Sequence, residues 1–185
     1  MIAKPFYELA EVGYFGNWGG VTRAPSGSFL CGLEMRYEYK RSSDHTATNG
    51  FRYTFCDQYQ WDRQTVRSFD GEEGEWLGVK MCPRGYYVNA FRAKVQDKQG
   101  SGDDTGLNDL EIRCHQPGTS NQKELRTGER LEQLKVQTQG TWREWKIAPA
   151  GYYPNGFHLR YEYSCSRCDD TAFNGFRLLF AKYRA

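Results

Sequence analysis

Three polar segments of the sequence carry the residue types that could do chemistry. They resemble one another, and each continues to an asparagine: Asp44-His45-Thr46 to Asn49, Asp103-Asp104-Thr105 to Asn108, and Asp169-Asp170-Thr171 to Asn174. Carboxylates in such loops could bind a sugar hydroxyl or Ca²⁺, or supply the acid and base of a glycosidase. The two carboxyl groups of a glycosidase lie about 5–5.5 Å or about 6.5–9.5 Å apart, whereas adjacent aspartates in a turn point apart. We therefore predict no catalytic residue in these segments.

The repetition of this segment favours a structural role, because a fold needs its turn three times and an enzyme needs its site once. Asp and Thr side chains can bond to backbone N–H groups of a turn, and Asn tolerates a positive φ. We predict that the turns are held by Asp44, Thr46, Asn49, Thr105, Asn108, Thr171 and Asn174. The aspartates at the other positions stay candidates for carbohydrate binding, namely Asp103, Asp104, Asp169 and Asp170.

The five tryptophans divide into two groups. Trp18, Trp76 and Trp145 stand at similar places relative to the repeated segments, so we expect them to pack in the core or at a sheet edge. Trp61 and Trp142 break this pattern. They are the tryptophans that we consider for an exposed platform on which a sugar ring stacks, although packing is the commoner role of an aromatic side chain.

Six cysteines could form three disulfides in a secreted protein, with free thiols and metal or redox roles as alternatives. Cys165 and Cys168 form a C-x-x-C, but no second pair or nearby histidine completes a zinc site. Two aspartates follow Cys168, and negative charge raises a thiol pKa. Proximity along the chain suggests the pairs Cys31–Cys56 and Cys165–Cys168.

Composition excludes several classes of function. The formal charge of +2 lacks the basic excess of a nucleic-acid-binding protein, and no apolar run approaches the roughly 20 residues of a membrane span. The sequence has no glycine-rich phosphate loop, no G-x-S-x-G segment and no pair of histidines spaced for zinc, so we predict no cofactor or metal. The first residues have no apolar core of a signal peptide. Either the protein is intracellular or the chain begins after a cleavage point, and the cysteines favour the second, extracellular interpretation.

Three internal repeats organise the chain. The Asp-Thr segments recur at intervals of 59 and 66 residues, and glycine–aromatic segments at Gly27, Gly85 and Gly151 recur at 58 and 66. We predict one domain over residues 1–185, with repeats at about 12–57, 63–115 and 131–183. The polar segment 116–132 fits neither a repeat nor a short connection, and is expected to be a flexible loop or a partner-binding insertion.

Each repeat is expected to contain four β-strands. A short strand (Val12–Phe15, Val66–Phe69 or Leu134–Thr138) precedes the tryptophan strand. Two longer strands follow, in which apolar and polar residues alternate as in half-buried antiparallel strands, for example from Leu33 to Tyr39 and from Phe51 to Phe55. A single sheet cannot bury its apolar face alone. We therefore predict an all-β fold, a β-prism I of three four-stranded Greek-key sheets with pseudo-threefold symmetry.

The second repeat resembles a known family. The segments Cys82-Pro83-Arg84-Gly85-Tyr86-Tyr87 and Gly102-Asp103-Asp104-Thr105-Gly106-Leu107-Asn108-Asp109-Leu110 are similar to the repeat of the vitelline membrane outer layer protein I family, over roughly residues 12–183. The resemblance implies a β-prism and a Cys82–Cys114 disulfide. The first and third repeats depart from the pattern, with Ala24 and Ala148 in place of the cysteine and His45 in place of the second aspartate.

The resemblance also implies a function. We expect a secreted, non-enzymatic coat protein that associates with glycans or with other extracellular matrix or coat proteins. A lectin-like module that binds oligosaccharides is the first alternative, and a weak chito-oligosaccharide glycosyl-transferring enzyme is the second.

The expected disulfides can be tested by intact mass. Protein from its native source is expected to weigh about six hydrogens less than the fully reduced chain, because each of three disulfides removes two hydrogens. Alkylation without reduction should then label no cysteine. Six labelled thiols would contradict the extracellular assignment.

Overall fold

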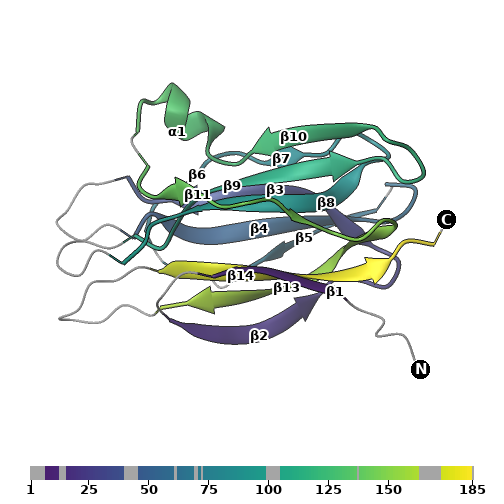
Figure 1. Ribbon diagram of the computed structural model, residues 1–185, viewed down its shortest axis with the longest axis horizontal. Helices are drawn as coiled ribbons and strands as arrows, with labels where there is room; N and C mark the ends of the chain where they lie inside the picture. The colour runs from purple at the N-terminus through teal and green to yellow at the C-terminus, as the bar shows by residue number, and fades with distance from the viewer. Residues whose placement is uncertain are drawn as a thin grey trace.

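The protein consists of three antiparallel sheets that surround one core (Figure 1). The computed structural model describes residues 7–12, 16–39, 46–60, 62–68, 71, 73–98, 105–136, 138–162 and 172–184. Sheet I has the strand order β5 (Arg63–Arg67), β4 (Thr48–Cys56), β3 (Phe29–Tyr37) and β6 (Glu75–Trp76), with β7 (Lys80–Met81) also on β3. Sheet II has the order β10 (Gln122–Arg126), β9 (Leu107–His115), β8 (Tyr87–Val95) and β11 (Thr141–Trp142), with β12 (Lys146–Ile147) also on β8. Sheet III has the order β1 (Tyr7–Val12), β14 (Phe173–Lys182), β13 (Tyr152–Tyr161) and β2 (Asn17–Arg23).

The inner faces of the three sheets share one core. The expected alternation is present: in β3, Leu33, Met35 and Tyr37 are buried, whereas Glu34 and Arg36 between them are partly exposed. Aromatic rings from different sheets touch in this core, for example Tyr53 on Phe157, with ring centroids 3.8 Å apart, and Phe91 on Phe176, at 4.4 Å. No sheet therefore buries its apolar face without the other two.

A pseudo-threefold axis is visible at one end of this core. Phe29 and Tyr87 begin the long strands β3 and β8, and Tyr153 is the second residue of the long strand β13, so each sheet contributes one of these rings. Their ring centroids form a near-equilateral triangle with sides of 5.8, 6.1 and 5.7 Å. Tyr183, just after β14, lies 5.5–5.7 Å from all three rings and covers them. The β-prism predicted from the sequence is confirmed.

The strand pairing differs from the repeats drawn on the sequence. The first two strands of a repeat join the long hairpin of the preceding repeat, not their own: β5, β6 and β7 complete the sheet of β3 and β4. In the same way β1 and β2, at the N-terminal side, complete the sheet of the C-terminal hairpin β13–β14, as Figure 1 shows for the purple and yellow strands. Each sheet therefore combines strands from two repeats.

Two expectations about individual strands are wrong. Sheets I and II contain five strands rather than four, because their outer strand is broken into two short pieces, β6 with β7 and β11 with β12. The strand expected at Leu134–Thr138 is absent: Leu134 lies in the turn after the short helix α1 (Glu129–Gln133). The strand beside β9, at the other edge of sheet II, is instead β10. It lies within the segment 116–132 that was expected to be a loop or an insertion.

Helix α1 and the residues before it contact both sheet I and the common core. Its Leu131 is fully buried in the common core, and Thr127 before it donates a long hydrogen bond to Met35 Sδ of sheet I, at 3.6 Å. Glu129 of the helix forms an ion pair with Lys80 at the end of sheet I. The extra residues of the second interval thus serve the packing of two sheets.

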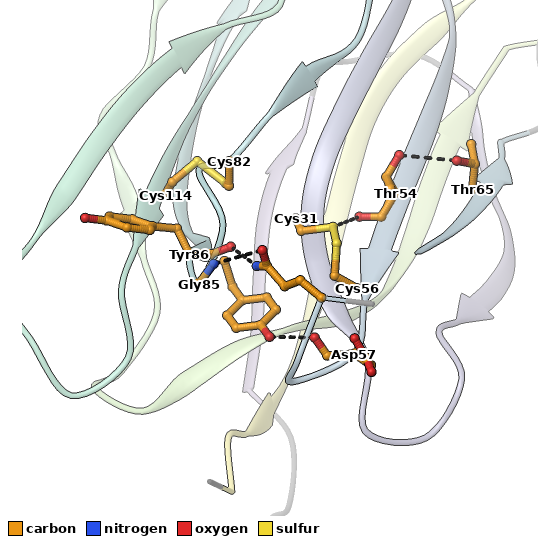
Figure 2. The surroundings of a disulfide bond; sticks show 11 residues. Cys31, Thr54, Cys56, Asp57, Thr65, Cys82, Gly85, Tyr86 and Cys114 are labelled. Carbon is orange, nitrogen blue, oxygen red and sulfur yellow. Dashed lines mark hydrogen bonds between the residues drawn. A yellow bond between two sulfur atoms is a disulfide. The ribbon is translucent and has the colours of Figure 1, made fainter. Parts of the chain in front are cut away.

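Two disulfides lie at neighbouring places in the fold, as Figure 2 shows. Cys31–Cys56 joins the adjacent strands β3 and β4, whereas Cys82–Cys114 ties the segment after β7 to β9 and so links sheet I to sheet II. Both pairs are those expected from the sequence. Cys165 and Cys168 lie outside the described residues.

The packing of α1 can be tested with two leucines of one turn. Leu131→Ala is expected to lower the free energy of unfolding by about 2–5 kcal/mol, because it removes a buried side chain from a filled core. Leu134→Ala should change it by less than about 0.5 kcal/mol, because Leu134 is 52% exposed. Urea unfolding measures both, and equal effects would contradict the role of the helix as a core element.

Candidate functional site

The first Asp-Thr segment forms a hydrogen-bonded turn. The backbone N–H and the hydroxyl of Thr46 both donate to Glu38 Oε2, at 3.1 and 2.5 Å. The Asn49 side chain, which is buried, donates to Thr46 Oγ1 at 2.5 Å and to the Ala47 carbonyl at 3.4 Å. These groups bond to one another and to the adjoining strand, so the geometry is that of a turn held from within.

The second segment repeats this arrangement, and the described part of the third segment repeats its asparagine bond. Thr105 donates to Gln96 Oε1 and receives the Asn108 amide at 2.8 Å. The Asn174 amide donates to the Ala172 carbonyl at 3.3 Å. The expectation that the asparagines adopt a positive φ is not met, since Ala47 and Ala172 do so, with φ of 56° and 48°. The asparagine side chains bond to the carbonyls of those strained residues instead.

Several of the expected site residues lie outside the described residues. They are Asp44, Trp61, Asp103, Asp104, Asp169, Asp170 and Thr171. The structure therefore leaves their roles as predictions. Among the described residues, no group of three acidic, cysteine or histidine side chains could hold a metal ion, and no helix is long and apolar enough to cross a membrane.

The tryptophans follow a different register from the one expected. Trp18, Trp76 and Trp142 each stand two residues after a glycine with positive φ. On the long strands, Trp18 pairs with Arg160, Trp76 with Arg36 and Trp142 with Lys94. Trp142 is thus the third equivalent tryptophan. The expectation that it lies outside the repeated pattern is wrong. The signal was present, because these tryptophans are 58 and 66 residues apart, like the glycines. Trp145 instead occupies the place of Val79.

Arginines lie across the rings of these tryptophans on the outer faces. The Arg177 guanidinium is 4.0 Å from the Trp18 ring centre, and that of Arg52 is 3.8 Å from Trp76. In sheet II, Arg92 lies 5.1 Å from both Trp142 and Trp145. Such cation–π pairs fix the rings in place. Trp142 is therefore half-buried and held by a cation, rather than standing free on the surface.

The cation that stands opposite the tryptophan on each long strand donates a hydrogen bond to the turn before the tryptophan strand. Arg36 Nη1 donates to the Gly71 carbonyl at 2.6 Å, Lys94 Nζ to that of Thr138 at 2.9 Å, and Arg160 Nε to that of Gly16 at 3.0 Å. Sequence analysis missed this set, because the alternation identifies only an outward position and not its partner.

Among the residues that the structure describes, one carboxylate is buried, and it lies in sheet II. Asp109 is 0% exposed and stands where the other repeats have Gly50 and Gly175. It accepts hydrogen bonds from Arg126 Nε at 2.6 Å and from the Gly128 N–H at 2.8 Å. Burial raises the pKa of Asp109, and the Arg126 guanidinium and the backbone N–H donors oppose that rise. The pair fixes β10 and the start of α1 and leaves no carboxylate oxygen open for catalysis.

A hollow of about 300 Å³ opens beside the edge strand β2. Its walls are six consecutive residues of β2, from Asn17 to Thr22, and inward-facing side chains of β13 and β14. A smaller hollow of about 90 Å³ is lined by Glu38, Tyr39 and the segment Glu73–Glu75. The smaller one combines a single tyrosine with three glutamates, whereas the larger one has several aromatic residues and neutral polar groups.

Three antiparallel sheets around a pseudo-threefold axis define a β-prism. Solved structures with this fold include wild-type Malaysian banana lectin, with a TM-score of 0.52, 12% identity, and coverage of 95% of this chain and 98% of the lectin. Calystegia sepium agglutinin is similar, with a TM-score of 0.53, 9% identity, and coverage of 95% and 97%. At such identities the likeness extends to the fold alone.

The sequence places the chain more closely within that class. A family model of vitelline membrane outer layer protein I matches residues 6–135 and 129–184, so the chain belongs to this family. Vitelline membrane outer layer protein 1 homolog of Homo sapiens is 32% identical over 112 residues, which is 58% of this chain and 50% of the human protein. The match therefore spans about half the length of that relative.

The buried ion pair predicts a pH-dependent variant. A carboxyl with a raised pKa contributes most stability below its ordinary pKa of about 3.9, and this contribution is lost as the pH rises through the raised value. Arg126→Met removes the only described cation on Asp109, so unfolding near pH 7 should become easier by about 3 kcal/mol or more. The loss should shrink toward pH 3.5.

Arg113→Met is the matched control for this variant. Arg113 also lies over a tryptophan and pairs with a carboxylate, but its partner Glu124 is 54% exposed. We expect a loss below about 1 kcal/mol with little pH dependence. A pH-independent effect of Arg126→Met, measured by urea unfolding at both pH values, would contradict the role of Asp109.

Proposed function

We propose that this chain is a secreted, non-enzymatic coat protein that acts by association with glycans and with other extracellular matrix or coat proteins. Membership of the vitelline membrane outer layer protein I family supports this role. The observation that carries it is the construction of the outer faces, where half-buried tryptophans are fixed by arginines on all three sheets. Side chains that are already fixed lose little conformational entropy when a partner binds, so a surface of this kind favours association.

The charge pattern of the faces supports association at more than one surface. The central cross-strand pair is Glu34–Arg52 in sheet I and Arg92–Glu111 in sheet II, with N–O distances of 3.0 and 2.5 Å. In sheet III, His158 stands opposite Arg177 at the equivalent place. Sheet III therefore differs in charge at this position from sheets I and II, which suits a protein that contacts more than one kind of partner.

The disulfides support an extracellular location. The Cys31–Cys56 and Cys82–Cys114 pairs form in oxidising compartments and are rare in the cytosol. Cys82–Cys114 also links two sheets, so it would hold the prism together outside the cell. The extracellular assignment rests on these bonds and on the family.

A lectin-like module is the second candidate. The hollow beside β2 favours it, because a small concave site with aromatic walls and a few polar groups is the usual form of a ligand pocket. The names of the lectins that share the fold agree with this candidate, although the shared fold by itself assigns no sugar.

A glycan array distinguishes the two candidates. A coat protein should bind several classes of glycan, with retention that falls as the salt concentration rises, because arginines on three faces contribute. A lectin-like module should show saturable binding of one sugar class that a free monosaccharide competes away. Absence of binding to every glycan would contradict the lectin-like module and the glycan part of the coat-protein proposal, and would leave only association with coat proteins.

Incubation with chitohexaose tests the enzymatic alternative in the same sample. We expect mass spectrometry to find the oligomer lengths unchanged. New longer and shorter oligomers that persist in protein of high purity would contradict a non-enzymatic role.

A further inference from the structure

The hollow beside β2 lies where a core side chain is missing. In sheet I the residue after Trp76 is Leu77, which is 4% exposed and whose N–H donates to the Met35 carbonyl at 2.9 Å. The residue after Trp18 in sheet III is Gly19, one of the walls of the hollow. In sheet II the equivalent residue is Arg143, which pairs with Asp97, so the space that a leucine fills in sheet I is open in sheet III.

Neither the backbone nor the neighbouring atoms require glycine at this place. The φ of Gly19 and of Gly20 lies outside the left-handed region, in contrast to Gly78, which follows Leu77 and has a φ of 95°. A Cβ on Gly19 would meet only the Leu159 carbonyl oxygen, at 3.7 Å, and one on Gly20 would meet nothing within 4 Å. Glycine within a strand weakens it and commonly marks a close approach of a ligand or another backbone.

The strand pairing at the hollow is also irregular. The register between β13 and β2 shifts between His158 and Arg160, so that Gly19 and Gly20 face Leu159 within a bulge. His158 Nε2 and the Gly19 carbonyl oxygen are 2.6 Å apart, a contact that fixes the bulged backbone from the outer face. Bulges of this kind redirect groups at binding sites. The hollow is therefore built into the sheet and not left by an exposed loop.

The walls of the hollow have two chemical characters. Phe157, Leu159, Tyr161 and Phe173 line the hollow from the core side, whereas the ring of Trp18 lies on the outer face under Arg177. Asn17 and Thr22, at the two ends of the wall that β2 forms, supply polar side chains. A purely apolar ligand would leave these polar groups without partners, which is costly in a confined site.

We propose that this hollow binds one neutral pyranose ring of a glycan. A pyranose has an apolar C–H face that can lie on the aromatic rings, and hydroxyl groups at its edge that can reach Asn17, Thr22 and the peptide groups of the two glycines. A volume of about 300 Å³ lies at the small end of ligand pockets, which suits a single ring. The inference rests on the proposed glycan association and assigns it to a site that differs from the arginine–tryptophan faces.

The test uses methyl glycosides of glucose, mannose, galactose and N-acetylglucosamine, titrated into the full chain. Binding is followed by tryptophan fluorescence and by saturation-transfer NMR. We expect at least one glycoside to bind, and Gly19→Leu to weaken that binding at least tenfold, because the leucine fills the hollow as Leu77 does in sheet I. Its thermal midpoint should not fall, since the added Cβ has room.

Two further variants keep the test decisive. Val79→Leu enlarges a side chain that is 53% exposed on the edge of sheet I and should leave binding unchanged. Asn17→Ala removes a polar wall group without filling the hollow and should weaken binding about fivefold or more. Asn17→Ala decides the matter should Gly19→Leu fail to fold.

The failures of the site and of the proposed function are distinguishable. Glycan-array binding that persists in Gly19→Leu and in Asn17→Ala overturns the site and leaves glycan association intact. An array without any binding by the unaltered chain overturns glycan association. Absence of glycoside binding overturns the site. Displacement of the bound glycoside by indole, with no displacement by any second sugar, also overturns it, because that result would mark the hollow as an apolar pocket.

Discussion

The structure depends on the burial of three sheet faces against one another. Each sheet of four or five strands has one apolar face, and only the other two sheets can cover it. The ring stack of Tyr53 on Phe157 and the triangle of Phe29, Tyr87 and Tyr153 are places where this dependence is visible. Loss of one sheet would expose the other two, so the prism is expected to unfold as a unit rather than sheet by sheet.

The sequence was sufficient for the parts of the fold that follow local periodicity. Alternation along β3 and β4 identifies strands and their inner faces, and equal intervals identify three copies. The order of the strands in each sheet could not be predicted in this way. Periodicity shows which face of a strand is buried, but it does not show which strand lies beside it. The misplacement of β5–β7 and of β1–β2 follows from that limit, as does the error at Leu134, where a turn after a short helix replaces the expected strand.

The candidate site was predictable only in part for a related reason. Trp142 could have been placed from its interval to Trp76, since that spacing is present in the sequence. The hollow could not, because it arises from an absent side chain at Gly19 and from aromatic residues on strands far along the sequence. Asp109 was likewise visible only as a departure from glycine, whereas its partner Arg126 lies on another strand.

The pairing of β1 with β14 makes the chain a closed ring that has been cut at one point. Sheet III contains both the first and the last described strand, with Tyr7 opposite Phe180, so it can form only after the C-terminal hairpin has been synthesised. Sheets I and II need no such delay. Their apolar faces therefore exist before their third partner does, and exposed apolar surface of this kind favours aggregation. Joining the two neighbouring strands by a linker and opening the ring at an exposed turn such as 117–120 would change the order of synthesis without changing any contact of the core.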